Sequence, residues 1–393
     1  MVYKFSELFH WSSGKPVKLD GGAVPVYGSN GIIGYTTKAK YRNKIILGRV
    51  GAYCGSVEYY PGSFNASDNT LITTCNEDLV LYKYAYYLLK QYKLNNFSGG
   101  SAQPLITQSL LKPLKCDIPE IKIQKRIASI LSAYDDLIEN NNRRIKILEK
   151  MAENLYKEWF VRFRFPGYEN SSFVASSIGR IPEGFSVLKM QDVIDYHIGG
   201  GWGSDVRDKN FECEAFVIRG TDFPYVKEGI LSTCPRRYHK IKNYRTRKLE
   251  EGDIILEVSG GTAEQPVGRA LLVTKDTLRR FGRKLICASF CKLVRLKRNI
   301  ISPYYFIYWM NFLYSTRIIE KFQLQSTGII NFKFEYFFKK GDILLPPVDL
   351  MHIFVGKIKT IKAQIDKLAE VNENLTKQRD MLLPRLMSGT LEV

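Results

Sequence analysis

The side chains best suited to chemistry in this 393-residue chain are the basic ones that gather in its second half. Residues 235–250, PRRYHKIKNYRTRKLE, hold seven Lys and Arg side chains with Tyr238 and Tyr244 between them, and residues 278–284, LRRFGRK, add four more. Lys and Arg neutralise phosphates, and aromatic rings pack on bases. A run of charge alone is usually a solvated surface, but the interleaved rings favour DNA contact here.

A second set of candidates surrounds short loops near the N-terminus. Gly28, Gly31 and Gly34 have GxxGxxG spacing, which is not the GxGxxG dinucleotide fingerprint and opens no evident helix, so we expect turns. Loops of this polar and basic composition contact phosphates and reach base edges. The DNA-binding residues predicted from the two regions are Ser29, Asn30, Lys38, Lys40, Arg42, Arg49, Arg236, Arg237, Lys240, Lys242, Tyr244, Arg245, Arg247, Lys248, Arg279, Arg280 and Lys284.

Candidates for catalysis are few. GDIILEVSG, residues 252–260, is similar to a nuclease core with Asp253 and Glu257 as metal ligands, but Ser259 stands where a catalytic lysine is needed. The chain has no Walker A motif, and LLPPVDL is not the Asn/Asp-Pro-Pro-aromatic element of an amino-methyltransferase. The seven Cys are scattered without a CxxC pair and the four His lie far apart, so we expect buried reduced thiols and no metal site.

The net charge of +19 is unevenly distributed. Residues 1–118 carry +6 (13 basic, 7 acidic) and residues 171–345 carry +10 (28 basic, 18 acidic). Residues 119–170 carry only +2 (10 basic, 8 acidic) and residues 346–393 only +1 (7 basic, 6 acidic). The excess charge, which favours a polyanionic partner, therefore belongs to two regions, called here the first lobe (1–118) and the second lobe (171–345).

Two near-neutral stretches separate and follow the lobes, and each predicts one long helix. Residues 124–160 contain neither Gly nor Pro, and apolar side chains recur there with strict 3,4 spacing, which is a heptad seam. Adding 227 to each number finds a second seam near the C-terminus, with Gly356 and Pro384 as departures that weaken the second helix. The predicted seam consists of Ile127, Leu131, Tyr134, Ile138, Asn141, Ile145, Leu148, Leu155, Phe354, Ile358, Ile361, Ile365, Leu368, Asn372, Leu375 and Leu382.

The two lobes also resemble each other in sequence, but more weakly than the two helical stretches do. Lys4 to Gly14 matches Lys189 to Gly199 at an offset of 185, and ASDNTLI (66–72) matches ASFCKLV (288–294) at an offset of 222. The second lobe is thus a longer version of the first, with its extra residues mostly between 200 and 287. Short Val, Ile and Tyr runs between turn residues predict β-hairpins in the first lobe, and residues 82–94 predict a helix.

The predicted fold class is α+β, with two mixed α/β lobes joined by two long helices and a pseudo-two-fold internal repeat. The predicted domains are a first recognition lobe (1–118), a central helix (119–165), a second recognition lobe (171–345) and a C-terminal helix (346–393). A two-fold relation would make the helices antiparallel, so that each buries the other's seam and the pair acts as a rigid spacer. The alternative is that each helix packs only on its own lobe. Asn141 and Asn372 are candidates to set the register.

Several stretches resemble the specificity subunit of type I restriction-modification systems, over essentially the whole chain. They include VYGSNGIIGY, IPEGFSVLKMQDV, VIRGTDF, the central IPEIKIQKRIASILSAYDDLIENNNRRIKILEK and the C-terminal QRDMLLPRLMSGTLEV. One departure is that the first lobe begins almost at its Lys4 to Phe9 element, without the Ile-Pro-Glu-Gly lead-in at 181–184. The resemblance adds Arg219 and Thr221 of VIRGTDF to the predicted DNA-binding residues.

The resemblance implies that each lobe is a target-recognition domain that reads half of an asymmetric, bipartite site in double-stranded DNA. It implies that the helices set the gap and dock two methyltransferase subunits, which motor-nuclease subunits join. The chain is then non-catalytic by itself, and S-adenosylmethionine, ATP and Mg²⁺ belong to the partners. No window of 18 uncharged apolar residues exists and the N-terminus lacks a signal-peptide core, which predicts a cytoplasmic protein without membrane contact.

Two other readings stay open from the residues. The first is a fused or split restriction nuclease with its own metal site at Asp253 and Glu257. The second is a nucleic-acid-binding coiled-coil scaffold. Magnesium-dependent cleavage by the isolated chain distinguishes the first, and competition between duplex DNA and RNA distinguishes the second.

Overall fold

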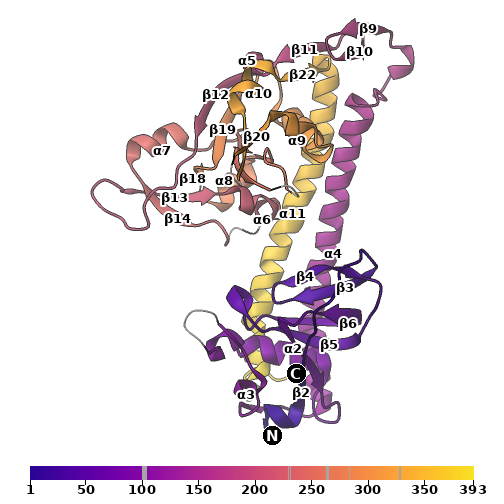
Figure 1. Ribbon diagram of the computed structural model, residues 1–393, viewed down its shortest axis with the longest axis vertical. Helices are drawn as coiled ribbons and strands as arrows, with labels where there is room; N and C mark the ends of the chain where they lie inside the picture. Colours follow the sequence, from indigo (N-terminus) through magenta and orange to yellow (C-terminus); the bar gives the residue numbers. More distant parts are fainter. Residues whose placement is uncertain (100–103, 229, 231, 263–264, 283, 327–328) are drawn as a thin grey trace. The chain divides into compact units, whose positions relative to one another are not determined.

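The computed structural model describes residues 1–99, 104–228, 230, 232–262, 265–282, 284–326 and 329–393. Its contacts divide the chain into two compact units. The terminal unit comprises Met1–Glu139 and Asn374–Val393, and the central unit comprises Asn140–Glu373. Each long helix contributes one part to each unit, because α4 runs from Ile121 to Phe160 and α11 from Val348 to Met387 (Figure 1).

The terminal unit holds one six-stranded sheet in the order β2-β7-β5-β6-β3-β4. Neighbouring strands are antiparallel except β3 and β6, which pair in parallel. Its elements are β1 (Val2–Lys4), α1 (Phe5–Leu8), β2 (Phe9–Ser13), β3 (Val24–Gly28), β4 (Gly31–Thr36), β5 (Tyr41–Gly48), β6 (Val57–Ala66), β7 (Thr70–Cys75), α2 (Tyr82–Gln91), α3 (Gln108–Leu111) and β8 (Lys115–Asp117). The predicted hairpins and the helix after residue 82 are confirmed.

The central unit holds several smaller sheets, of which the largest has the order β12-β19-β15-β17 and a second has the order β14-β13-β18. Its strands are β9 (Phe173–Ser176), β10 (Gly179–Pro182), β11 (Ser186–Lys189), β12 (Ile194–Gly199), β13 (Cys213–Ile218), β14 (Arg236–His239), β15 (Ile254–Glu257), β16 (Ser259–Gly261), β17 (Ala270–Leu272), β18 (Leu285–Cys287), β19 (Cys291–Leu296), β20 (Gln323–Ser326), β21 (Ile329–Phe332) and β22 (Asp342–Leu345). Its shorter helices are α5 (Met190–Val193), α6 (Phe223–Lys227), α7 (Ile241–Arg247), α8 (Lys275–Arg280), α9 (Pro303–Ser315) and α10 (Phe334–Lys340).

The two units share an order of elements. In each, a short strand leads through a one-turn helix into a sheet strand: β1, α1 and β2 in one, β11, α5 and β12 in the other. The one-turn helix is closed by a carboxylate that accepts from a backbone N–H, Glu7 from Lys4 at 2.6 Å and Asp192 from Lys189 at 3.3 Å. The first strand pairs with the last strand before the long helix, β1 with β8 and β11 with β22.

The long helices pack together along the predicted seam. Every predicted seam side chain is buried or half-buried. In the central unit Asn141 lies opposite Asn372, Ile145 packs with Ile365, and Phe160 contacts Phe354 with ring centroids 4.9 Å apart. Residue numbers rise along α4 as they fall along α11, so the helices run in opposite directions there.

The ends of the helices are also part of the lobe cores. In the terminal unit Ile127 and Leu131 of α4 and Leu386 and Met387 of α11 belong to one apolar cluster with the lobe's own residues. Pro384, expected to weaken the last turn, lies inside α11. Burial of Leu386 and Met387 explains why the helix continues, because it offsets the hydrogen bond that proline cannot donate.

The remaining fold-level expectations concern thiols and membranes. All seven cysteines are free, and six of them are buried. Burial raises the pKa of the Cys116 thiol to about 11 and that of Cys234 to about 12, so both thiols are protonated at neutral pH. Among the described residues, no helix is long and apolar enough to cross a membrane.

The seam asparagines generate a prediction. Asn141 Nδ2 donates to Asn372 Oδ1 at 2.9 Å, Asn372 Nδ2 donates to Asn142 Oδ1 at 2.8 Å, and both seam side chains are 8% exposed. We expect Asn372→Leu to cost about 1–3 kcal/mol of unfolding free energy, because Asn141 keeps a buried amide without its partner. The double substitution with Asn141→Leu should recover that loss or exceed it, because no orphaned amide is left in the seam.

Urea denaturation followed by far-UV circular dichroism checks this expectation. Asn374→Leu, an exposed position on the same helix as Asn372, is the matched control and should change little. If the single and double variants both unfold like the unmodified chain, the asparagine pair has no role in the seam.

Candidate nucleic-acid interface

The GxxGxxG glycines of the first lobe form the β3–β4 hairpin. Gly28 pairs with Gly31 across the turn, and Gly31 has φ +98, which only glycine adopts freely. Ser29 in the turn donates from Oγ to Asn69 O at 2.6 Å, which fixes the loop to the turn between β6 and β7. Asn30 at the tip is exposed. The turn interpretation is confirmed, and the tip presents a side-chain amide of the kind that reads base edges.

Three of the basic candidates of this lobe lie close together on the chain, Lys38 and Lys40 between β4 and β5 and Arg42 near the start of β5. Lys38, Lys40 and Arg42 are all exposed, and Lys40 Nζ lies 5.0 Å from the Tyr41 ring centroid. Arg49 is different, because it is half-buried and its Nε is buried with no hydrogen-bond partner among the described residues. The exposed trio is free to reach a polyanion, whereas Arg49 is partly enclosed by its own lobe.

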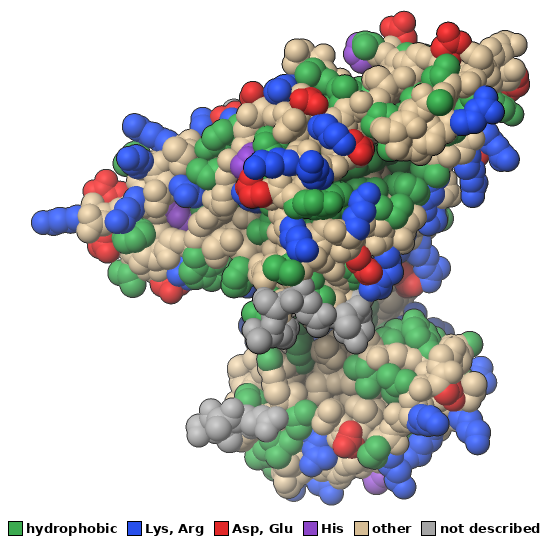
Figure 2. Space-filling view, turned by 45° about the horizontal axis from the view of Figure 1, so that its top comes forward, with side chains coloured by type: hydrophobic (Ala, Val, Ile, Leu, Met, Phe, Trp, Pro, Cys, Tyr) green, Lys and Arg blue, Asp and Glu red, His purple; other side chains and the backbone are tan. Residues whose placement is uncertain are grey.

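The first basic run of the second lobe is divided between strand β14 and helix α7. On α7, Lys242 and Arg245 are exposed, as is Lys240 just before it. Lys and Arg side chains protrude from the end of the lobe that carries α7 (Figure 2). Tyr244 turns inward and packs against a small apolar cluster around Val217, so it anchors the helix.

Other basic side chains of this run interact with neighbouring groups of the lobe. Arg247 donates from Nε to Gly199 O at 3.0 Å, and Lys248 pairs with Glu250 at 3.1 Å. Arg236 is exposed, with its guanidinium 4.8 Å from the Phe216 ring centroid. Arg237 is only 8% exposed and is bound to backbone oxygens and to Asp205. Burial argues against the predicted direct DNA contact of Arg237.

The second basic run also contains one enclosed arginine side chain. Arg280 has a side chain only 6% exposed, and it pairs with Asp276 at 2.6 Å and with Glu373 of α11 at 3.3 Å. It is therefore a brace between the lobe and the long helix. Arg279 and Lys284 are exposed, and Arg283 of the same run lies outside the described residues.

In the VIRGTDF stretch, Arg219 is bonded within the lobe whereas Thr221 is exposed. Arg219 makes two hydrogen bonds of 2.9 Å to Asp222, which is 1% exposed, and one of 2.7 Å to Thr233 O. These bonds raise the pKa of Arg219 and hold the turn after β13. Thr221 in that turn is exposed. The Arg219 guanidinium is thus largely used within the lobe.

The candidate nuclease carboxylates are both neutralised. Asp253 is fully buried and accepts two bonds of 2.8 Å from Arg295, and Glu257 accepts bonds of 2.8 and 2.6 Å from Arg269. Such bidentate arginine pairs occupy the oxygens that a metal would need. No group of three or more His, Cys, Asp or Glu in the described part of the chain is placed to bind a metal. The two pairs instead fix the two ends of strand β15.

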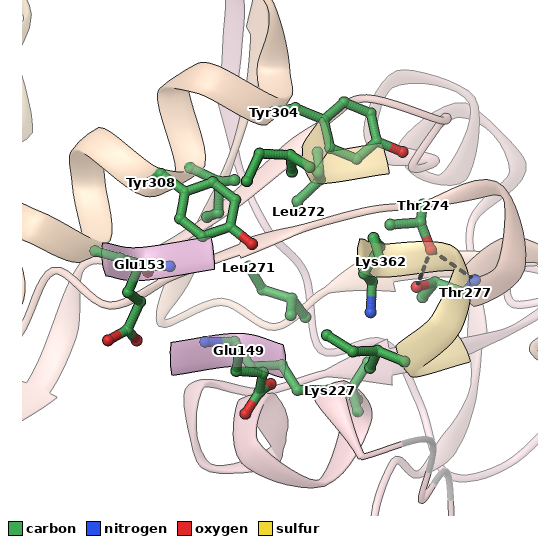
Figure 3. Close-up of a pocket in the computed structure, with 15 residues that line it drawn as sticks. Glu149, Glu153, Lys227, Leu271, Leu272, Thr274, Thr277, Tyr304, Tyr308 and Lys362 are labelled. Atoms are coloured by element: carbon green, nitrogen blue, oxygen red, sulfur yellow. Dashed lines mark hydrogen bonds between the residues drawn. The ribbon is translucent and has the colours of Figure 1, made fainter. Parts of the chain in front are cut away.

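A cavity of about 160 Å³ lies where the second lobe meets the long helices, and sequence reasoning missed it (Figure 3). Glu149 of α4, Lys227 of α6 and Lys362 of α11 line it, together with Tyr304 and Tyr308 of α9. Burial lowers the pKa of Lys227 and raises that of Glu149. The cavity is smaller than typical cofactor pockets of about 300–1,000 Å³. These residues carried no motif, because they come from four separate elements.

Comparisons with known proteins agree with the resemblance found in the sequence. Residues 1–150 match the family model described as type I restriction modification DNA specificity domain. The chain is 26% identical over 329 residues to the type I restriction enzyme MjaIX specificity subunit of Methanocaldococcus jannaschii, covering 81% of this chain and 71% of that protein. It is 23% identical over 359 residues to the MjaVIII specificity subunit of the same organism, covering 89% and 80%.

A solved structure shares the fold. The type I restriction-modification system S subunit from M. genitalium aligns over 98% of this chain and 95% of its own, with a TM-score of 0.53 and 16% identity. The inferred similarity to the type I specificity subunits is confirmed.

Arg279 and Arg280 form a matched pair for experiment. We expect Arg280→Met to cost about 1–3 kcal/mol of unfolding free energy, because it removes the buried guanidinium that pairs with Asp276 and Glu373 and donates to Asp366 O. Arg279→Met should cost less than about 1 kcal/mol, because its pair with Asp276 is exposed to solvent. Urea denaturation of the two variants compares them directly, and equal losses would contradict the assignment of Arg280 as a brace.

Proposed function

We propose that this chain is the DNA sequence-specificity subunit of a type I restriction-modification complex, and that it selects the site on which other subunits act. The observation that carries the proposal is the pairing of two related lobes, each presenting exposed basic residues, with two long packed helices. The chain is similar in sequence to type I specificity subunits along more than four-fifths of its length, which agrees with this function. The chain itself contributes recognition, and we assign no reaction step to it.

Each lobe reads one half of an asymmetric, bipartite sequence in double-stranded DNA. The shared order of strand, one-turn helix and strand in the two units supports an internal repeat and hence two equivalent roles. The sheet β14-β13-β18 and helix α7 have no counterpart in the part of the terminal unit that the structure describes, which supports a different sequence preference for the second half-site. The exposed side chains that we assign to DNA contact are Asn30, Lys38, Lys40, Arg42, Thr221, Arg236, Lys240, Lys242, Arg245, Arg279 and Lys284.

The two helices form an antiparallel coiled coil that sets the gap between the half-sites. The buried seam and the Asn141–Asn372 bond support a defined register. Apolar side chains stay exposed away from the seam on α4: Leu137 is 52%, Ile147 60% and Met151 53% exposed. Exposed apolar residues on a helix suit a protein interface, and we assign them to the docking of two methyltransferase subunits.

The chemistry belongs to the partners. Methyltransferase subunits with S-adenosylmethionine flip and methylate adenine, and motor-nuclease subunits with ATP and Mg²⁺ complete the complex. Extruding a base costs a few kcal/mol, so phosphate contacts on both half-sites are needed to hold the distorted duplex. The complex works on cytoplasmic DNA. The nuclease alternative has lost its basis, because Arg295 and Arg269 occupy its two carboxylates.

Methylation mapping tests the function. Single-molecule sequencing of DNA from cells that carry this chain with its neighbouring methyltransferase should find methyl-adenine in a split motif with a fixed gap. Cells that carry either protein alone should lack it. A confirmed complex that produces no new methylation would move the function to a scaffold, and preference for RNA over duplex DNA would identify that scaffold's ligand.

The salt dependence of binding tests the exposed residues of α7. Replacing Lys242 and Arg245 by alanine together should weaken DNA binding and reduce the slope of log K against log salt by about 1.8, because each phosphate contact contributes about 0.9. Lys122→Ala with Lys125→Ala, two exposed positions on α4, removes the same charge elsewhere and should leave the slope nearly unchanged. A slope that both double variants alter equally would remove α7 from the DNA surface.

A further inference from the structure

One tryptophan of this chain is exposed, and it lies in a glycine-rich loop of the second lobe. Trp11, Trp159 and Trp309 are at most 6% exposed, whereas Trp202 is 40% exposed. Trp202 belongs to the stretch GGGWG that connects β12 to β13. A large ring facing solvent forgoes the stabilisation of burial, and tryptophan is enriched among the residues that dominate binding interfaces, which makes Trp202 a candidate contact residue.

The loop around Trp202 is held firmly on both sides. On one side Gly200 N donates to Cys291 O and Gly201 N donates to Cys287 O, both at 2.9 Å. On the other side Ser204 and Tyr238 exchange backbone hydrogen bonds of 2.8 and 2.9 Å. The exposed ring is therefore presented from a fixed backbone.

Two of the glycines are required for this path. A Cβ at Gly200 would lie 2.1 Å from Ala288 O, and a Cβ at Gly203 would lie 2.4 Å from Tyr238 O. Gly203 also has φ +73, in the left-handed region that favours glycine. Gly200 and Gly203 thus let the loop backbone pack closely against Ala288 and Tyr238, and Trp202 between them is the one large side chain of the stretch.

The ring of Trp202 is itself oriented by Arg237. The Arg237 guanidinium lies 4.5 Å from the ring centroid, and Arg237 Nε donates to Trp202 O at 2.9 Å. Arg237 is also held by Asp205, so it does not move away easily. A cation that covers one face of an indole restricts its rotation, and it leaves the rest of the ring surface available to a ligand.

The charges near the loop identify the ligand. Arg247, at the end of α7, donates to Gly199 O at 3.0 Å and so joins the loop to that helix. The same helix carries the exposed Lys242 and Arg245. A duplex whose phosphates contact these cations brings base edges toward the adjoining loop. An apolar ring at that position matches the thymine methyl group that a base pair presents in the major groove of a duplex.

We propose that Trp202 is a specificity-determining residue of the second lobe, whose indole ring packs against a base of the half-site while Arg237 holds it in position. The inference rests on the proposed function, because it requires that the second lobe binds DNA. It assigns Arg237 a positioning role in place of the direct contact predicted from the sequence.

Tryptophan fluorescence provides a direct test on the full chain. Because the other three tryptophans are buried, acrylamide quenching reports mainly on Trp202, and the difference from the Trp202→Phe variant isolates its signal. Cognate duplex should shield Trp202 and lower its quenching toward that of the buried residues. A DNA of unrelated sequence, bound at low salt, should shield it less.

Affinity measurements supply the second readout. Trp202→Ala should weaken binding of the cognate duplex by about 5- to 150-fold, the range for loss of one specific base contact. Binding of unrelated duplex should change less than about twofold, because phosphate contacts supply it. Trp202→Phe should keep most of the affinity. Tyr336→Ala removes an aromatic side chain of α10 that is 53% exposed, and it is the matched control.

The outcomes separate this inference from the proposed function. If the chain binds a cognate duplex but Trp202 is not shielded and Trp202→Ala binds normally, the inference fails and the proposed function stands. If Trp202→Ala weakens cognate and unrelated DNA equally, Trp202 has no role in specificity. If the unmodified chain with its methyltransferase partner shows no sequence preference, both fail together.

Discussion

The structure depends on the burial of one apolar stripe on each of two forty-residue helices. A helix of this length with many charges is not stable in water through propensity alone, and tertiary packing has to supply the difference. The apolar stripes gain this stabilisation by packing against each other and against the lobes. Leu131 and Leu386 belong to the core of the terminal unit, and Phe160 and Phe354 belong to the core of the central unit. Helix and lobe therefore stabilise each other, which is why the compact units divide each helix.

Burial also divides the arginines into two classes that composition does not distinguish. Arg237, Arg269 and Arg280 are held by carboxylates within the fold. The exposed Arg245 on α7 has no such structural use among its described contacts. A net charge of +19 thus overstates the charge available to DNA, although the exposed remainder is still concentrated on particular elements such as α7.

The features that the sequence predicts well here depend on residues close together in the chain. The 3,4 spacing identified seam positions that are all buried or half-buried, and turn residues identified the β3–β4 hairpin. Ion pairs were not predictable in the same way, because the partners are distant: Arg280 and Glu373 are 93 positions apart, and Asp253 and Arg295 are 42 apart. The exposed Trp202 had a readable signal, a large ring among glycines, that a search for charge overlooked.

In the central unit, the two faces of one sheet contribute to two different apolar cores. Along β15, Ile254 and Leu256 point into the core shared with the long helices, and Ile255 points into the core beneath α6, α8 and β18. The same alternation continues on β19, where Val294 faces the first core and Leu293 the second. Because successive strand residues face opposite sides, the sheet separates most of the two cores. They also approach each other beside the sheet, where Val226 and Leu271 of the second core line the same cavity as Ile358 of α11. The exposed Lys242, Arg245 and Trp202 belong to neither core, so these side chains can differ while the contacts that hold the lobe on its helices stay the same.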